Sequence, residues 1–174
     1  MKTSNKTKAL FLFIDILLFV VFVILDQITK SLAVTHLKDK PSLILWENIF
    51  ELHYLENRGA AFGMLQNQKV LFVIIAVVML TAITYVLVKI PRNKHYYILE
   101  FLLVMIASGA VGNLIDRVSL GYVVDFFYFK LIDFPIFNVA DIYVSVSCVL
   151  LAVLLIFFYK EKDFDFLSRQ KKKE

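Results

Sequence analysis

The stretch that decides the fold runs from Gly109 to Asp141. It reads in order Gly109-Ala-Val-Gly112-Asn113-Leu-Ile-Asp116-Arg117, then Val123-Val124-Asp125-Phe126, then Phe137-Asn138-Val139-Ala140-Asp141. Its acids, amides and arginine lie between two long apolar segments. Polar groups at the edges of membrane-length segments are costly to bury and usually carry function. The stretch therefore raises the question of whether these side chains meet in space.

The composition is typical of an integral membrane protein. Of the 174 residues, 60% are hydrophobic, which exceeds the usual share in soluble domains. The length predicts a single membrane-embedded domain covering residues 1–174. The net charge of +4 comes from short flanking segments, which favours membrane topology over nucleic-acid binding. The only cysteine, Cys148, excludes an intrachain disulfide.

Four apolar segments approach or reach the roughly 20 residues that span a bilayer. The predicted spans are residues 9–25, 70–90, 96–115 and 142–159. The first is too long for the core of a signal peptide, and no Ala-x-Ala cleavage site follows it. We therefore expect it to be a retained membrane anchor.

Lys and Arg residues predict the orientation of these spans. Most of them lie in the N-terminus, the short second connection and the segment 160–174. The positive-inside rule places these regions in the cytoplasm, with 160–174 as a basic tail. The first connection, the end of the third span and the start of the fourth then lie at the outer face. The polar residues expected to converge there are Asn57, Asn113, Arg117, Asp125, Asn138 and Asp141.

The outer connections carry strand patterns. Residues 49–56 alternate in part between apolar and polar side chains, and residues 122–131 are rich in β-branched and aromatic side chains. Between them, residues 56–59 are typical of a turn, and 60–65 of a short amphipathic helix or loop. The sequence thus predicts a small sheet on the outer membrane surface.

The residue inventory restricts the chemistry. The sequence has no His-Glu-x-x-His motif, and its three histidines are scattered over predicted connections, which argues against a zinc site. No histidine lies in a span to activate a serine or cysteine. Two close carboxylates that share a proton can activate water and protonate a leaving group. Asp125 and Asp141 are candidates for such a pair, and we expect no metal or cofactor.

Each of these residues also has a structural interpretation. Asn138-x-x-Asp141 fits a capping box that begins the fourth span, with Asn138 as N-cap. Asp125 could be a solvated acid at the end of a strand. Asn57 and Gly59 could simply form a turn.

The supporting residues allow similar alternatives. Asp116 could pair with Arg117 and anchor the third span at the interface. Asp26 and Lys30 are four residues apart and could form an ion pair at a helix end. Gly112 belongs to a face of small residues that could serve helix packing.

The order of the motifs resembles that of the lipoprotein signal peptidases, also called signal peptidases II. The matching blocks are Asp26-Gln-Ile-Thr-Lys30, Glu56-Asn57-Arg-Gly59-Ala-Ala-Phe62, Gly109-Ala-Val-Gly112-Asn113-Leu-Ile-Asp116-Arg117, Val123-Val124-Asp125-Phe126 and Phe137-Asn138-Val-Ala140-Asp141. Five blocks in register over nearly the whole chain are a specific signal. The family commonly has Gly-Gly before the Ala of the third block, where this chain has Ser108-Gly109.

The resemblance implies an aspartic endopeptidase of the bacterial plasma membrane, with four transmembrane helices and a small extracytoplasmic β-cradle. Its substrate would be a prolipoprotein carrying diacylglycerol, cut just before the lipidated lipobox cysteine. Asp125 and Asp141 match the catalytic pair. The resemblance assigns substrate binding to Asn57, Gly59, Asn113, Arg117 and Asn138, and a supporting role to Asp26, Lys30, Gly112, Asp116 and Ala140. We expect a monomer in contact with membrane lipids.

Two other classes of function compete with this hypothesis. A small proton-coupled transporter would use acids near the bilayer midplane and show internal symmetry. Only Asp15 fits the first condition, and no repeat is evident. A membrane scaffold subunit would not need this set of polar residues at one face.

Overall fold

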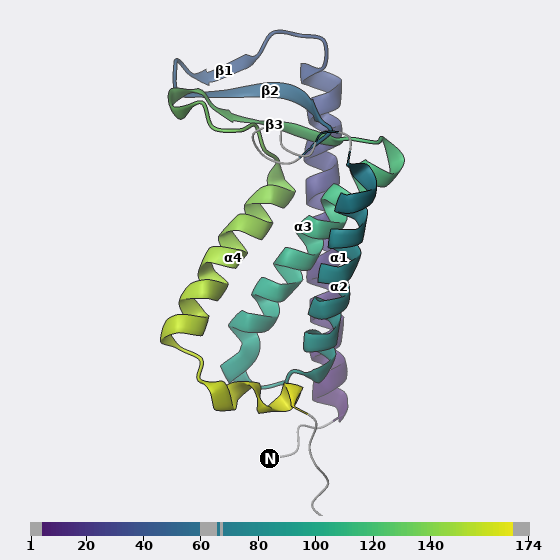
Figure 1. Ribbon diagram of the computed structural model, residues 1–174, viewed down its shortest axis with the longest axis vertical. Helices are drawn as coiled ribbons and strands as arrows, with labels where there is room; N and C mark the ends of the chain where they lie inside the picture. Colours follow the sequence, from purple (N-terminus) through teal and green to yellow (C-terminus); the bar gives the residue numbers. More distant parts are fainter. Residues whose placement is uncertain (1–4, 60–65, 67, 169–174) are drawn as a thin grey trace, which may run out of the picture.

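Four long helices and a three-stranded sheet make up the fold, with the sheet at one end of the helical bundle (Figure 1). The computed structural model describes residues 5–59, 66 and 68–168. Its long helices are α1 (Asn5–Leu37), α2 (Lys69–Lys89), α3 (Tyr97–Ser119) and α4 (Val139–Phe157). All four are long and apolar enough to cross a membrane. The predicted fold class is therefore confirmed.

The first helix is longer than the predicted 9–25 span. α1 continues to Leu37, so Asp26 and Lys30 lie within the helix and not at its end. The prediction of a helix-end ion pair is therefore wrong in its placement. Both side chains are buried and bonded to neighbouring elements, so these polar residues do not end the helix. The other three helices begin and end within a few residues of their predicted spans.

The sheet is antiparallel, in the order β1 (Leu43–Trp46), β2 (Phe50–Asn57) and β3 (Val123–Phe129). Strands β2 and β3 were predicted from sequence, and both are confirmed. β1 was missed because four consecutive apolar residues show no alternation. The predicted helix or loop at 60–65 lies outside the described residues.

Helix α3 occupies the centre of the bundle and packs against α1, α2 and α4. Most of it is buried, whereas the other helices expose many apolar side chains, as lipid-facing helices do. Its small residues permit close packing. A Cβ on Gly109 would overlap the backbone of Ala140 in α4, and one on Gly112 would overlap the carboxylate of Asp26 in α1.

The opposite end of the bundle is closed by the segment that follows α4. The 3-10 helix η4 (Glu161–Leu167) lies against η2 (Lys94–Tyr96), where the Tyr96 hydroxyl donates to the Asp163 carbonyl at 2.7 Å. The start of the predicted 160–174 tail is thus a packed helix. Near this end, the loop residue Arg92 pairs with Asp15 of α1 and Glu100 of α3.

Candidate active site

The N-terminus of α4 is fixed by a capping box. The Asn138 Oδ1 accepts from the Asp141 backbone N–H at 3.0 Å, and the Asp141 carboxylate accepts from the Asn138 N–H at 3.0 Å. The predicted capping role of both residues is confirmed. The box places the Asp141 side chain at the end of α4 that faces the sheet.

Strand β3 supplies the second carboxylate. Asp125 is only 1% exposed, and Asn57, in the last position of β2, donates its Nδ2–H to Asp125 Oδ2 at 2.8 Å. The Gly59 N–H donates to Asn57 Oδ1 at 2.9 Å, so the amide nitrogen of Asn57 must face the acid. The interpretation of Asp125 as a solvated acid is wrong, because the helices and the sheet together cover it.

Asn138 connects the two acids. Its Nδ2–H donates to Asp125 Oδ1 at 2.6 Å, while its backbone N–H donates to Asp141 Oδ2. The side chain is fully buried. One residue therefore sets the positions of both carboxylates.

The surroundings of Asp125 change its acidity. Burial, which disfavours the charged form, and then the nearby Asp141 carboxylate raise the pKa of Asp125 to about 7. The hydrogen bonds from Asn57 and Asn138 oppose this rise. Asp125 can therefore exchange a proton near neutral pH, as an acid–base catalyst requires.

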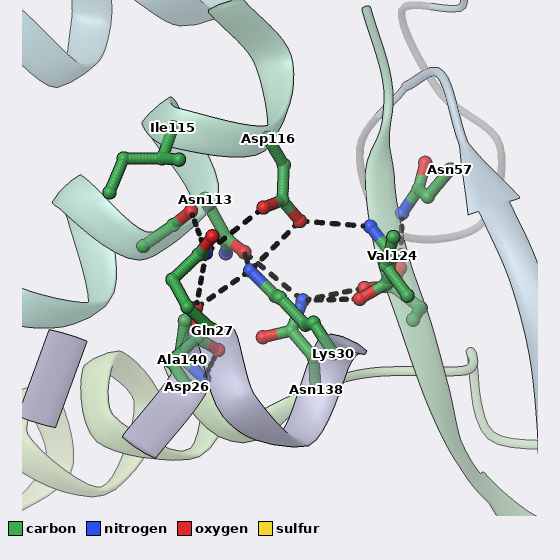
Figure 2. Close-up of polar contacts among 12 residues, drawn as sticks. Asp26, Gln27, Lys30, Asn57, Asn113, Ile115, Asp116, Val124, Asn138 and Ala140 are labelled. Atoms are coloured by element: carbon green, nitrogen blue, oxygen red, sulfur yellow. Dashed lines mark hydrogen bonds and ion pairs between the residues drawn. The ribbon is translucent and has the colours of Figure 1, made fainter. Parts of the chain in front are cut away.

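Helix α3 contributes Asn113 to the same group. Its Nδ2–H donates to Asp141 Oδ1 at 2.8 Å, and its Oδ1 accepts from Asn138 Nδ2 at 3.0 Å and from Lys30 Nζ at 2.8 Å. Figure 2 shows Asn113 of α3 in contact with Lys30 of α1 and with Asn138, the N-cap of α4. Asn113 is thus the link between the carboxylate pair and the ion cluster behind it.

That ion cluster consists of Asp26, Lys30 and Asp116, all buried (Figure 2). The Lys30 ammonium lies 2.9 Å from Asp26 Oδ2 and 3.1 Å from Asp116 Oδ2. Asp26 Oδ1 accepts from the Ala140 N–H at the start of α4, and Asp116 accepts from the Val124 N–H in β3. The cluster therefore joins α1, α3, α4 and the sheet at the position of the carboxylate pair.

Two of these contacts correct or extend the sequence analysis. The predicted pair of Asp116 with Arg117 is wrong. Adjacent residues on a helix point in different directions, and here Asp116 bonds Lys30 while Arg117 bonds the Gly59 carbonyl. Gln27 was missed: its Nε2–H donates to Asp116 Oδ1 at 3.0 Å and to the Gly112 carbonyl at 3.2 Å.

Arg117 has no carboxylate partner among the described residues. Its Nη2–H donates to the Gly59 carbonyl at 3.3 Å, and its guanidinium lies 4.5 Å from the centre of the Phe72 ring in α2. This is a cation–π distance. The guanidinium is held in place while its charge is left without an ion pair in the described part of the chain.

The two acids open onto a common cavity of about 460 Å³. Most of its polar lining comes from predicted site residues, namely Asn57, Gly59, Asn113, Arg117, Asp125 and Asp141. Asn138 lies behind this surface, as do all five predicted supporting residues. The part of the cavity wall around the two acids is therefore polar.

The rest of the lining is mostly apolar and was missed in the sequence. It consists of Phe72, Val123, Phe134, Pro135, Ile136, Phe137, Ile142, Ser145 and Val146. The position of Asp141 offered one signal, since Ser145 lies one helical turn further along α4. Phe72 reaches the cavity from α2, Val123 from β3, residues 134–137 from the loop before α4, and Ile142 and Val146 from α4. Within the described ranges, no group of three His, Cys, Asp or Glu residues could hold a metal ion.

Comparison with known proteins gives a consistent result. The family model described as signal peptidase (SPase) II matches residues 18–157. The lipoprotein signal peptidase of Caldanaerobacter subterraneus subsp. tengcongensis is 50% identical over 145 residues, which are 83% of this chain and 95% of that protein. The lipoprotein signal peptidase of Clostridioides difficile is 41% identical over 143 residues, 82% and 95% of the two chains.

The fold is also similar to that of a solved protein. A structure described as a bacterial membrane enzyme aligns with a TM-score of 0.72 at 33% identity. The alignment covers 92% of this chain and 93% of the other. The similarity therefore extends over most of the chain.

Proposed function

The chain belongs to the signal peptidase II family, and from this premise we propose that it is an aspartic endopeptidase of the bacterial plasma membrane. Its proposed substrates are prolipoproteins that carry diacylglycerol on the lipobox cysteine. Cleavage falls directly before that cysteine and releases the signal peptide. The name shared by its relatives, lipoprotein signal peptidase, supports this choice of substrate. The transporter and scaffold alternatives have no comparable support.

The observation that carries the proposal is the shared environment of Asp125 and Asp141. Both line one cavity, and both are bonded by Asn138. Each also receives a hydrogen bond from a second amide, Asn57 for Asp125 and Asn113 for Asp141. Two carboxylates that share one cavity and one hydrogen-bonding partner repel each other when both are ionised, and this repulsion favours a pair that holds one proton near neutral pH.

In the first step, the ionised carboxylate takes a proton from water as the water oxygen bonds to the scissile carbonyl carbon. The protonated carboxyl group gives its proton to the carbonyl oxygen, which yields a neutral gem-diol. In the second step, the first carboxyl returns its proton to the amide nitrogen and the C–N bond breaks. The other carboxylate recovers a proton from a gem-diol hydroxyl, and the pair regains its starting state.

The cavity lining supports binding of an extended peptide next to lipid. The Arg117 guanidinium, held by Gly59 and Phe72, is proposed to donate to carbonyl oxygens of the peptide or of the lipid esters. Ile142 and Val146 of α4 form an apolar side that suits a chain anchored by acyl groups. The amides of Asn57, Asn113 and Asn138 hold the acids and border the bound peptide.

The proposed topology follows the distribution of basic residues. Both termini lie in the cytoplasm, and the sheet and the cavity lie at the outer face. The proposed working form is a monomer.

The test is cleavage of a purified diacylated precursor in detergent or proteoliposomes. Asp125→Asn and Asp141→Asn should each lower kcat by about a thousandfold or more, because each removes one partner of the proton exchange. Asp133→Asn is the matched control, since Asp133 bonds the Tyr128 hydroxyl on the exposed side of the sheet. Cleavage at the normal rate by a folded Asp125→Asn or Asp141→Asn variant would refute the paired mechanism. Equal cleavage of a precursor without lipid would refute the proposal that the substrate must carry diacylglycerol.

A further inference from the structure

Among the described residues, three asparagine amides contact the carboxylate pair, and each must present its NH₂ group to donate a hydrogen bond to a carboxylate. Two are oriented by backbone donors. The Gly59 N–H occupies Asn57 Oδ1, and the Asp141 N–H occupies Asn138 Oδ1. Because those oxygens are fixed, the nitrogens of both amides must face Asp125.

Asn113 is different, because no backbone N–H among the described residues bonds its side-chain oxygen. Its Oδ1 accepts instead from the Lys30 ammonium at 2.8 Å and from the Asn138 amide at 3.0 Å. A turned amide would direct its NH₂ group at these two donors and its oxygen at the Asp141 carboxylate. Lys30 is only 3% exposed, so its charge acts here without screening by solvent.

We propose that Lys30 is a positioning residue for the aspartate pair, whose buried ammonium orients the Asn113 amide so that it donates to Asp141. This inference rests on the proposed function of the pair. It assigns Lys30 a role in catalysis in addition to its contacts with Asp26 and Asp116.

The charges around the pair fit this role. Arg117 approaches from α3 on the cavity side. From behind come Lys30 and Asp26 of α1, and Asp116 of α3, which together carry one net negative charge. Without Lys30, two buried carboxylates would remain without a cation behind the pair. Both the lost charge and the released amide would then make ionisation of the pair harder.

The experiment compares Lys30→Met with Lys130→Met, a control that removes the exposed lysine that pairs with the buried Glu51 in the sheet. Both are measured by precursor cleavage across pH, normalised to folded protein. Lys30→Met should lower kcat about tenfold or more, with a smaller change in KM, because a charged hydrogen bond in the site is lost. The acid limb of kcat/KM should move up by about one pH unit. Lys130→Met should leave both kcat and the acid limb of kcat/KM unchanged.

A purely structural role for Lys30 predicts a different result. Lys30→Met would then lower only the yield or melting temperature, and kcat per folded molecule and the acid limb would stay the same. That outcome would overturn the proposal.

A second variant covers the case in which Lys30→Met does not fold. Lys30→Met combined with Asp116→Asn keeps the net charge of the cluster, and the new amide oxygen can still accept from the Val124 N–H. It should also lose turnover, because the donor to Asn113 is absent. Normal kcat in this double variant would equally overturn the proposal. Full activity of Asp125→Asn would instead refute the proposed function itself.

Discussion

Asn138 allows the most direct test of how stability and catalysis share one side chain. Its oxygen caps α4, and its nitrogen donates to Asp125 at 2.6 Å. Asn138→Ser keeps an oxygen acceptor for the cap and removes the donor, whereas Asn138→Ala removes both. The two variants therefore separate the two bonds.

The magnitudes follow from the contacts. Loss of the cap costs about 1 kcal/mol, so Asn138→Ala should have a free energy of unfolding lower than that of Asn138→Ser by this amount. Loss of the buried donor to a charged acceptor costs about 1.5–3 kcal/mol in either variant. If that bond also holds Asp125 in the transition state, kcat falls about tenfold to a hundredfold in both variants.

The assay combines thermal unfolding in detergent with cleavage of a diacylated precursor at matched amounts of folded protein. Asn93→Ala is the control, because Asn93 caps the 3-10 helix η2 at the far end of the bundle by accepting from the His95 N–H. It should lower stability with no loss of kcat. Wild-type kcat in Asn138→Ser would refute the reasoning, because the bond to Asp125 would then be dispensable.

Three further predictions concern stability. Gly112→Ala should lower the free energy of unfolding by about 1–3 kcal/mol, because the added methyl group overlaps the Asp26 carboxylate. Arg92→Gln should cost about 3–5 kcal/mol and leave kcat per folded molecule unchanged, because it strands two largely buried carboxylates far from the cavity. Because the folded-state pKa of Asp125 is raised to about 7, the folded protein binds more protons than the unfolded chain between about pH 4 and 7. Stability relative to Asp125→Asn should therefore fall as pH rises through that window, by up to about 4 kcal/mol.

Each of these has a clear contrary result. A Gly112→Ala protein as stable as the wild type would mean that α1 and α3 separate easily. Loss of turnover in folded Arg92→Gln would show coupling between the two ends of the bundle. A pH-independent stability difference between the wild type and Asp125→Asn would show that Asp125 has the same pKa in the folded and unfolded chains.

Local patterns in the sequence predicted most of the elements of the fold. Apolar segments of membrane length predicted four helices, and β-branched and aromatic runs predicted two of the three strands. The N-cap motif at Asn138 was also readable, because a cap depends on residues only three positions apart. The end of α1 could not be predicted in the same way. Asp26 and Lys30 are tolerated inside the helix because Lys30 also pairs with Asp116, which lies far away in the sequence.

By itself the sequence determined the membrane-spanning architecture, the cap of α4 and a short set of candidate catalytic acids. Only the tertiary structure decided how those acids are held. Lys30 meets Asn113 across 83 positions, and Asn57 meets Asp125 across 68. Such contacts depend on how α1, α3 and the sheet pack together, and no local periodicity encodes that packing. The same packing turned Asp116 away from its neighbour Arg117 and toward Lys30.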